Sequence, residues 1–199
     1  MTEKTAKKRK VAWGITGGGD RLAETIEVMK QIKKQHGEAV EIQVYLSKAA
    51  VTVLKHYELE NELKNSFEQV YAEVDANTPF LAGWLQQGKY EFLLIAPATS
   101  NTVAKIACQI ADTMLTNTVA MGLKASATVY VMPTDMQEGV TWTRLPKGEK
   151  MKLEVRHEDA ENVKKISKIE HLSVIAQPEE IRGIFKKHFP HVNPQEKKD

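Results

Sequence analysis

The sequence predicts a three-layer α/β fold, in which helices cover both faces of a doubly wound parallel sheet. Short apolar segments alternate with segments of helical periodicity, which favours parallel strands joined by crossover helices. Several apolar segments end in glycine, proline or serine, as buried strands commonly do. The 199 residues can bury one sizeable core, and no internal repeat divides them. We therefore predict one domain over residues 11–190, between a basic tail at 1–10 and a C-terminal tail at 191–199.

The N-terminal half carries two clear apolar segments. The first ends at three consecutive glycines and the second at Ser47, and each is followed by apolar residues at helical spacing. A helix also begins after Pro79, a residue that suits the first turn. The elements predicted here are strands at 10–17, 40–47 and 66–75, and helices at 21–37, 49–57 and 81–87.

The C-terminal half opens with the most apolar segment of the chain, FLLIA. The helical pattern that follows over 102–124 is either one long helix or two helices broken near Asp112. Residues 134–150 are an extended loop or a hairpin. The other predicted elements are strands at 92–96, 127–133, 152–156 and 172–176, and helices at 159–171 and 178–189.

Composition and charge limit the function classes. Lys plus Arg number 28 and Asp plus Glu 26, and this near-balance argues against nucleic acid as the main partner. The lysines of residues 4–10 indicate a solvated tail, with an anionic partner surface as the alternative. We see no signal peptide and no apolar segment that would span a membrane, so we expect a cytoplasmic protein without membrane contact.

The single cysteine, Cys108, excludes an intramolecular disulfide and an all-cysteine iron–sulfur cluster within one chain. Its place in an apolar helical pattern predicts a buried side chain. No metal is expected, because the histidines show no metal-ligand spacing in the sequence. The histidines concerned are His157, His171, His188 and His191.

Three predicted strand exits carry distinctive residues, and a parallel sheet places its strand exits along one edge. At the first exit, Gly17 and Gly18 let backbone N–H groups approach an anion at a helix start. The alternative is a plain turn with Asp20 as helix N-cap. The segment matches neither a Walker A loop nor the full dinucleotide fingerprint. At the second exit, Ser47 is either an N-cap or a phosphate ligand.

The third exit, APATSNT over residues 96–102, has more polar side chains than a helix cap requires. One such residue is enough for capping. Here four polar residues follow Pro97 and Ala98. The surplus points to a neutral polar ligand, or to one with diffuse negative charge, over the edge of the sheet.

Together these segments resemble the homo-oligomeric FMN flavoproteins, a family that includes flavin-containing cysteine decarboxylases and prenyl-FMN synthases. The matching segments are ITGGG, LSKAA and IAPATSNTVAKIACQIADTMLTNT. APATSNT stands in the place of the family's Pro-Ala-Ser-Ala-Asn-Thr motif. The opening AWGITGGG and the C-terminal part are most similar to the archaeoflavoprotein and dihydromethanopterin reductase group. The resemblance implies a flavodoxin-like or Rossmann-like fold, bound FMN, and homo-oligomers built on trimers.

The resemblance also implies a set of FMN-binding residues. The glycine turn and Ser47 would hold the phosphate and ribityl end, while the residues after the third strand exit would bind the phosphate, ribityl chain or flavin edge. Asp112 and Thr116 would help to shape the pocket, either within one subunit or from the far side of a subunit contact. No catalytic side chain is assigned. The full set is Thr16, Gly17, Gly18, Ser47, Ala96, Pro97, Ala98, Thr99, Ser100, Asn101, Asp112 and Thr116.

The resemblance implies an FMN-dependent oxidoreductase or electron-transfer flavoprotein. A ferredoxin or another iron–sulfur protein would supply electrons, and a dihydropterin is one candidate acceptor. The decarboxylases' histidine before the Trp84 helix has no counterpart near Thr78 and Pro79, and their Met-Asn motif is absent from MPTDMQEG. Both absences argue against decarboxylation. A flavin-dependent decarboxylase or transferase of the same family is kept as an alternative, and a non-enzymatic assembly subunit is another.

Two tryptophans also have alternative interpretations. Trp13, on the first predicted strand, is either a core residue or a ring beside the flavin. Trp142 is either a cover over the site or a partner contact, or an ordinary hairpin residue.

Overall fold

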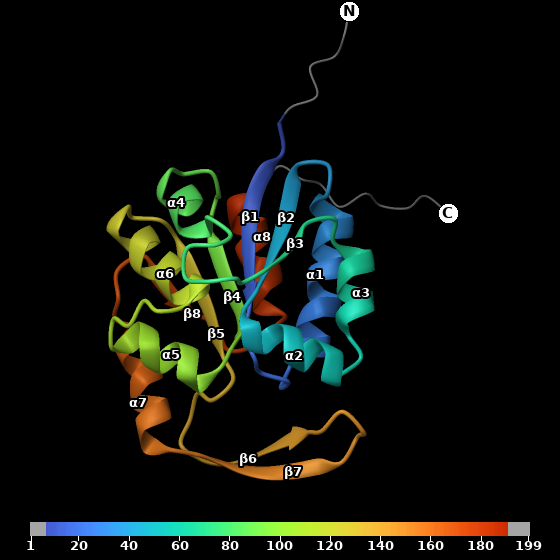
Figure 1. Cartoon of the computed structure of the whole chain (residues 1–199), viewed down its shortest axis with the longest axis vertical. Coiled ribbons are helices and arrows are strands. Elements are labelled where there is room, and N and C mark those ends of the chain that lie inside the picture. The colour runs from blue at the N-terminus through green and yellow to red at the C-terminus, as the bar shows by residue number, and fades with distance from the viewer. Residues whose placement is uncertain (1–6, 191–199) are drawn as a thin grey trace, which may run out of the picture.

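Residues 7–190 are described by the structure, a computed structural model, and form a six-stranded sheet between two layers of helices (Figure 1). All neighbouring strands are parallel, in the order β3-β2-β1-β4-β5-β8. Their bounds are β1 Arg9–Ile15, β2 Val40–Leu46, β3 Val70–Ala72, β4 Leu93–Ala98, β5 Val129–Pro133 and β8 Leu172–Val174. This arrangement confirms the predicted fold class. Most of the predicted basic tail and all of the C-terminal tail, residues 1–6 and 191–199, lie outside the described residues.

The helices divide between the two faces of the sheet. One hydrophobic core joins the sheet to α1 Leu22–His36, α2 Lys48–His56, α3 Glu60–Ser66 and α8 Glu180–His188. A second core joins it to α4 Leu81–Gln86, α5 Ser100–Ala107, α6 Met114–Lys124 and α7 His157–Ile166. Strand alternation produces this division, since successive side chains of a strand point to opposite faces.

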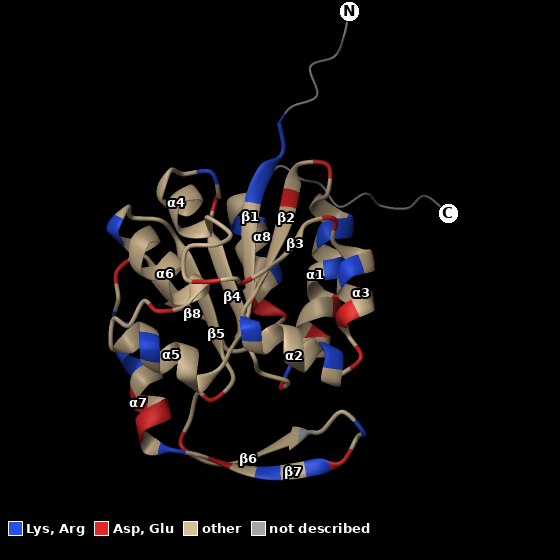
Figure 2. Cartoon of the chain, in the orientation of Figure 1, with Lys and Arg blue, Asp and Glu red and all other residues tan. Residues whose placement is uncertain are grey.

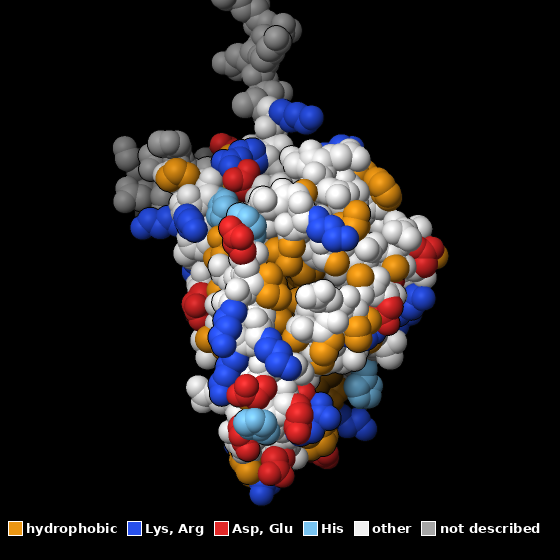
Figure 3. All heavy atoms as spheres, turned by 90° about the vertical axis from the view of Figure 1, so that its left-hand side faces the viewer, with side chains coloured by type: hydrophobic (Ala, Val, Ile, Leu, Met, Phe, Trp, Pro, Cys, Tyr) orange, Lys and Arg blue, Asp and Glu red, His pale blue; other side chains and the backbone are white. Residues whose placement is uncertain are grey.

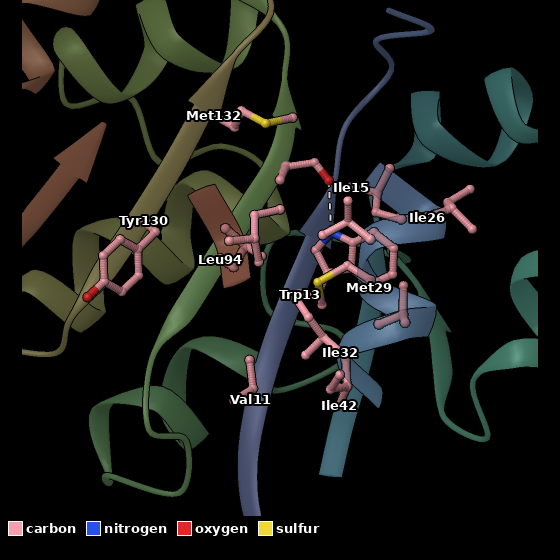
Figure 4. Packing of buried hydrophobic residues seen from close by; sticks show 14 of the residues in the cluster. Val11, Trp13, Ile15, Ile26, Met29, Ile32, Ile42, Leu94, Tyr130 and Met132 are labelled. Carbon is pink, nitrogen blue, oxygen red and sulfur yellow. Dashed lines mark hydrogen bonds between the residues drawn. The ribbon is translucent and has the colours of Figure 1, made fainter. Parts of the chain in front are cut away.

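The central strand β1 shows how burial on both faces holds the sheet. Val11, Trp13 and Ile15 enter the first core (Figure 4). Ala12 enters the second. Full burial of a large apolar side chain contributes about 1.5–3 kcal/mol. Gly14 leaves space for the second layer, because a Cβ there would lie 2.7 Å from Leu115 Cδ2.

The segment predicted as one long helix or two helices over 102–124 forms two helices, α5 and α6. Thr113 begins α6 with a capping box, in which its hydroxyl and that of Thr116 each accept a hydrogen bond from the other residue's N–H. The prediction that Cys108 is buried was wrong. Cys108 is exposed because it lies beyond Ile106, the last buried residue of α5.

Residues 134–150, predicted as a loop or hairpin, contribute to an antiparallel hairpin of β6 Gly139–Arg144 and β7 Lys150–Val155. It forms a separate two-stranded sheet and runs below the main sheet in the view of Figure 1. Among the described residues, no helix combines the length and apolar character that crossing a membrane requires.

The strand order reverses between β1 and β4. The connections from β1 to β2 and β3 run one way along the sheet, and those from β4 to β5 and β8 run the other way. In open parallel sheets, such a reversal leaves a crevice beyond the carboxyl ends of the two strands. The glycine turn follows β1, and APATSNT begins with the last three residues of β4. Both segments lie at this crevice.

Candidate functional site

Thr16 ties the two strand exits together. Its N–H and its hydroxyl both donate to the carbonyl of Pro97, at 3.2 and 2.9 Å. Its hydroxyl oxygen in turn accepts a hydrogen bond from the N–H of Thr99, at 2.9 Å. Thr16 is 2% exposed, so these hydrogen bonds are shielded from water. The two loops are therefore held in a fixed relative position.

The last three residues of β4 each accept a hydrogen bond at their backbone carbonyl. The carbonyl of Ala96 accepts from Trp13 Nε1 at 2.8 Å, and that of Ala98 accepts from the N–H of Thr134 at 2.9 Å. Since the Pro97 carbonyl is taken by Thr16, all three backbone acceptors of this segment are in use. Ala96, Pro97 and Ala98 are themselves buried. Of the polar residues that follow them, Thr99 and Ser100 are half-buried, Asn101 is exposed and Thr102 is buried.

The glycine turn fits between three other segments. A Cβ on Gly17 would lie 2.6 Å from Ala49 Cβ in α2. A Cβ on Gly18 would lie 3.0 Å from Thr134 Cγ2 and 3.4 Å from Thr99 Cγ2. The backbone thus approaches its neighbours more closely than a side chain permits, as a loop that cradles an anion does. The predicted N-cap at Asp20 was wrong: Arg21 occupies that position, with φ 58° and no side-chain cap.

Ser47 and Thr99 are N-caps of helices that begin at this edge. Ser47 Oγ accepts from the N–H of Ala50 at 3.1 Å, and Thr99 Oγ1 accepts from that of Thr102 at 3.4 Å. Both predicted ligands therefore also have capping roles. The first turn of a helix leaves further N–H groups without intrahelical partners, so the start of α5 retains donors for an anion.

Glu73 accepts hydrogen bonds from free N–H groups at the starts of two helices, α2 and α6. Its carboxylate accepts from the N–H of Lys48 at 3.1 Å and from that of Met114, the first residue of α6, at 2.9 Å. A carboxylate between two helix N-termini is stabilised by both dipoles. Glu73 follows β3, and its role was missed from the sequence.

Asp135, which follows β5, is a second residue that sequence reasoning missed. Its Oδ2 accepts a hydrogen bond from the hydroxyl of Ser100 and one from that of Thr134, the latter at 2.8 Å. Burial raises the pKa of nearby Asp20, although Arg21 opposes the shift. A carboxylate together with hydroxyl groups suits a polyhydroxyl chain, whose hydroxyls both donate and accept hydrogen bonds.

Two predicted residues lie apart from these loops. Asp112 is exposed and binds Lys105 Nζ at 2.8 and 2.9 Å, and this contact holds the pKa of the carboxyl below its usual value. Thr116 is buried and lines an apolar groove of 370 Å³ that none of the other predicted residues line. Asn101, by contrast, lies exposed in the first turn of α5 beside Ser100.

The hairpin lines one side of a pocket of 230 Å³ beside the glycine turn. Gly18, Gly19, Tyr57, Thr134 and Asp135 line the pocket from the body of the protein. From the hairpin, the cross-strand pairs Thr141–Leu153 and Thr143–Met151 line it. Trp142 lies at its border and is 61% exposed. The site thus combines polar groups at the sheet edge with an apolar cover.

Comparisons with known proteins agree on one family. The model of the Flavoprotein family matches residues 1–188. An uncharacterized protein of Methanocaldococcus jannaschii is 46% identical, over 90% of this chain and 96% of the relative. Dihydromethanopterin reductase (acceptor) of the same organism is 28% identical, over 88% of this chain and 95% of the relative. The crystal structure of Burkholderia xenovorans DmrB in complex with FMN, described as a cubic protein cage for redox transfer, superposes with a TM-score of 0.77. It has 28% identity, with 95% of this chain and 98% of DmrB covered.

Proposed function

Since the chain belongs to the Flavoprotein family, we propose that it binds FMN at the crevice between β1 and β4 and serves as a redox protein. The observation that carries this proposal is the convergence of the glycine turn and APATSNT at the point where strand order reverses, with Thr16 joining them. The similarity to FMN-bound DmrB over nearly the whole chain supports it.

The residues of the crevice fit the three parts of FMN. Gly17 and the first turn of α5 offer backbone N–H groups to the phosphate. The Asp135 carboxylate, with the hydroxyls of Ser100 and Thr134, suits the hydroxyls of the ribityl chain. The apolar hairpin residues that line the pocket suit the flavin ring.

FMN, when bound, supplies the electron-transfer chemistry, and the protein supplies orientation and access. Thr16 holds the two binding loops in a fixed relative position, and the β6–β7 hairpin covers one side of the pocket. No side-chain acid or base is assigned, since an electron-transfer role does not require one.

The proposed donor is a ferredoxin or another iron–sulfur protein, because the single Cys108 cannot hold a cluster in this chain. The proposed acceptor is a dihydropterin. This choice is supported by the similarity to a dihydromethanopterin reductase along most of both chains.

A visible absorption spectrum of the purified protein, followed by anaerobic reduction and addition of dihydropterin, tests this function. Flavin bands that bleach on reduction and return with dihydropterin support a pterin reductase. Bands that return only with a protein acceptor support an electron carrier instead. Absence of bands, before and after incubation with FMN, contradicts the proposal and favours an assembly subunit.

Asn101→Ala is expected to weaken FMN binding, whereas Cys108→Ser is expected to leave it unchanged. Both side chains are exposed and lie on the same segment, but only Asn101 is in the first turn of α5. One lost hydrogen bond contributes about 1 kcal/mol, or roughly fivefold in affinity. Fluorescence titration of the two apoproteins with FMN measures the difference. Equal affinities would place the flavin away from Asn101.

We also propose that the protein is a homo-oligomer built on trimers. Apolar side chains gather around the groove between α5 and α6 (Figure 3), and Phe80 and Ile110 are 53% and 47% exposed. Apolar surface of this kind is commonly covered by a partner. Sedimentation at micromolar concentration should show a trimer or a multiple of it, and a monomer would contradict this.

A further inference from the structure

A hollow of 670 Å³ lies at the amino-terminal edge of the sheet, opposite the proposed FMN site. It is bordered by the beginning of β1 and by the residues that precede β3 and β4. Tyr71 and Trp84 form aromatic walls, and Lys7, Lys8 and Lys89 contribute cations. We call this hollow the amino-edge basin. Figure 2 shows basic residues at the start of β1, which borders it.

The floor of the basin is a fixed polar network. The hydroxyls of Tyr45 and Tyr90 both contact Gln43 Oε1, and Gln43 is 3% exposed. Gln69 Oε1 accepts from the Tyr71 hydroxyl at 2.8 Å. Burial raises the pKa of Tyr90 to about 12, so this tyrosine stays a neutral hydrogen-bonding group at neutral pH.

Each floor amide also retains donor capacity. An amide NH₂ carries two N–H donors. Gln43 Nε2 and Gln69 Nε2 each donate to Glu41 Oε1, which uses one donor of each. Neither amide makes a second N–H hydrogen bond within residues 7–190, and half-buried Gln69 can offer its second N–H to a ligand with acceptor atoms, such as a heterocyclic ring.

The cations of the basin exceed its acids. Arg9 contacts Glu91, and Lys10 Nζ lies 3.4 Å from Glu41. Within residues 7–190, Lys7, Lys8 and Lys89 have no ion pair within 4.0 Å. Lys89 Nζ instead lies 6.0 Å from the ring centroid of Trp84, which places a cation beside an aromatic face. Uncompensated cations in a concave site raise the local concentration of anions.

We propose that the amino-edge basin binds a nucleotide, with its base against Trp84 or Tyr71 and its phosphate among Lys7, Lys8 and Lys89. The volume lies in the range of small-molecule pockets. A base requires an aromatic face and acceptor or donor partners, and a phosphate requires cations. The basin supplies both within one concavity, whereas an acidic protein surface would not need the amides of Gln43 and Gln69. This site is separate from the proposed FMN site, and it does not rest on the proposed function.

Isothermal titration of the full chain with AMP tests the proposal. Wild-type protein should bind AMP at least about tenfold more tightly than ribose 5-phosphate, because base stacking contributes on that scale. Lys89→Glu and Lys8→Glu should each weaken AMP binding about fivefold or more. Lys168→Glu is the matched control: it makes the same charge change on an exposed lysine outside the basin and should bind AMP as wild type does.

Visible spectra of the same variants keep this site distinct from the flavin site. Unchanged flavin bands together with the expected loss of AMP binding would support the basin. Absence of heat at about 1 mM AMP would overturn the proposal, as that limit excludes a useful affinity. AMP and ribose 5-phosphate of equal affinity, or AMP binding that persists in both basin variants, would each overturn it as well.

Discussion

Trp13→Ala is expected to lower the free energy of unfolding by about 3–5 kcal/mol, the range for loss of a large buried aromatic side chain. The side chain is 0% exposed and meets Phe67 edge to face, with ring centroids 5.3 Å apart. Its Nε1 also donates to the carbonyl of Ala96 at 2.8 Å (Figure 4). Urea unfolding followed by circular dichroism measures the change.

Trp13→Phe separates packing from hydrogen bonding. Phenylalanine keeps an aromatic ring but leaves the Ala96 carbonyl without its donor, which costs about 1–3 kcal/mol for a buried group. We therefore expect a smaller loss of stability than with alanine, together with weaker FMN binding, because Ala96 is the first residue of the binding segment APATSNT. A Trp13→Ala protein as stable as wild type would contradict the central place of this side chain in the core.

The structure also decides between the two interpretations of Trp13. The indole enters the core on the side of α1, where it packs among Ile15, Ile26 and Met29 (Figure 4). Core packing is thus the interpretation that the structure supports, and the hydrogen bond to Ala96 connects that core to the crevice.

The sequence predicts the strand exits better than it predicts which exits meet. The apolar strands, the glycine turn and APATSNT each carry a local signal, because burial and helix starts impose characteristic residues. Asp135 carries no such signal: it reaches Ser100 only because β5 lies beside β4, and strand order is not written in a local pattern. Glu73 was missed for the same reason, since its contact with Met114 at the start of α6 spans 41 residues of sequence.

Helix ends were a second source of error. Periodicity predicted a buried Cys108. The helical pattern of the sequence, however, continues past Ala107, where α5 ends. Likewise, aspartate is a residue type that commonly caps a helix. The N-cap position of α1 is nevertheless Arg21, whose backbone is left-handed. Both positions depend on how tertiary contacts divide the chain, which local propensity describes only weakly.

Gly17→Ala is expected to weaken FMN binding about tenfold or more, equivalent to about 1.4 kcal/mol. A Cβ at this position would lie 2.6 Å from Ala49 Cβ. Because carbon atoms pack at about 3.5–4.0 Å, the glycine turn would have to move by roughly 1 Å away from α2. Gly17 is not among the residues of positive φ, so the effect would arise from this contact and not from backbone strain. FMN titration of the apoprotein measures it.

Ala49→Gly provides a direct rescue of the same contact. Without the Ala49 Cβ, the next atoms around a Cβ at position 17 are the carbonyl carbon and Cα of Ala49, at 3.5 and 3.6 Å, which is ordinary contact. The double variant Gly17→Ala/Ala49→Gly should therefore recover most of the lost affinity. Ala49→Gly alone should lower helix stability by about 1 kcal/mol without a comparable loss of flavin. If the double variant binds FMN no better than Gly17→Ala, the proximity of the turn to α2 does not control the site. Recovery would show that the spacing between the glycine turn and α2 sets the affinity for FMN.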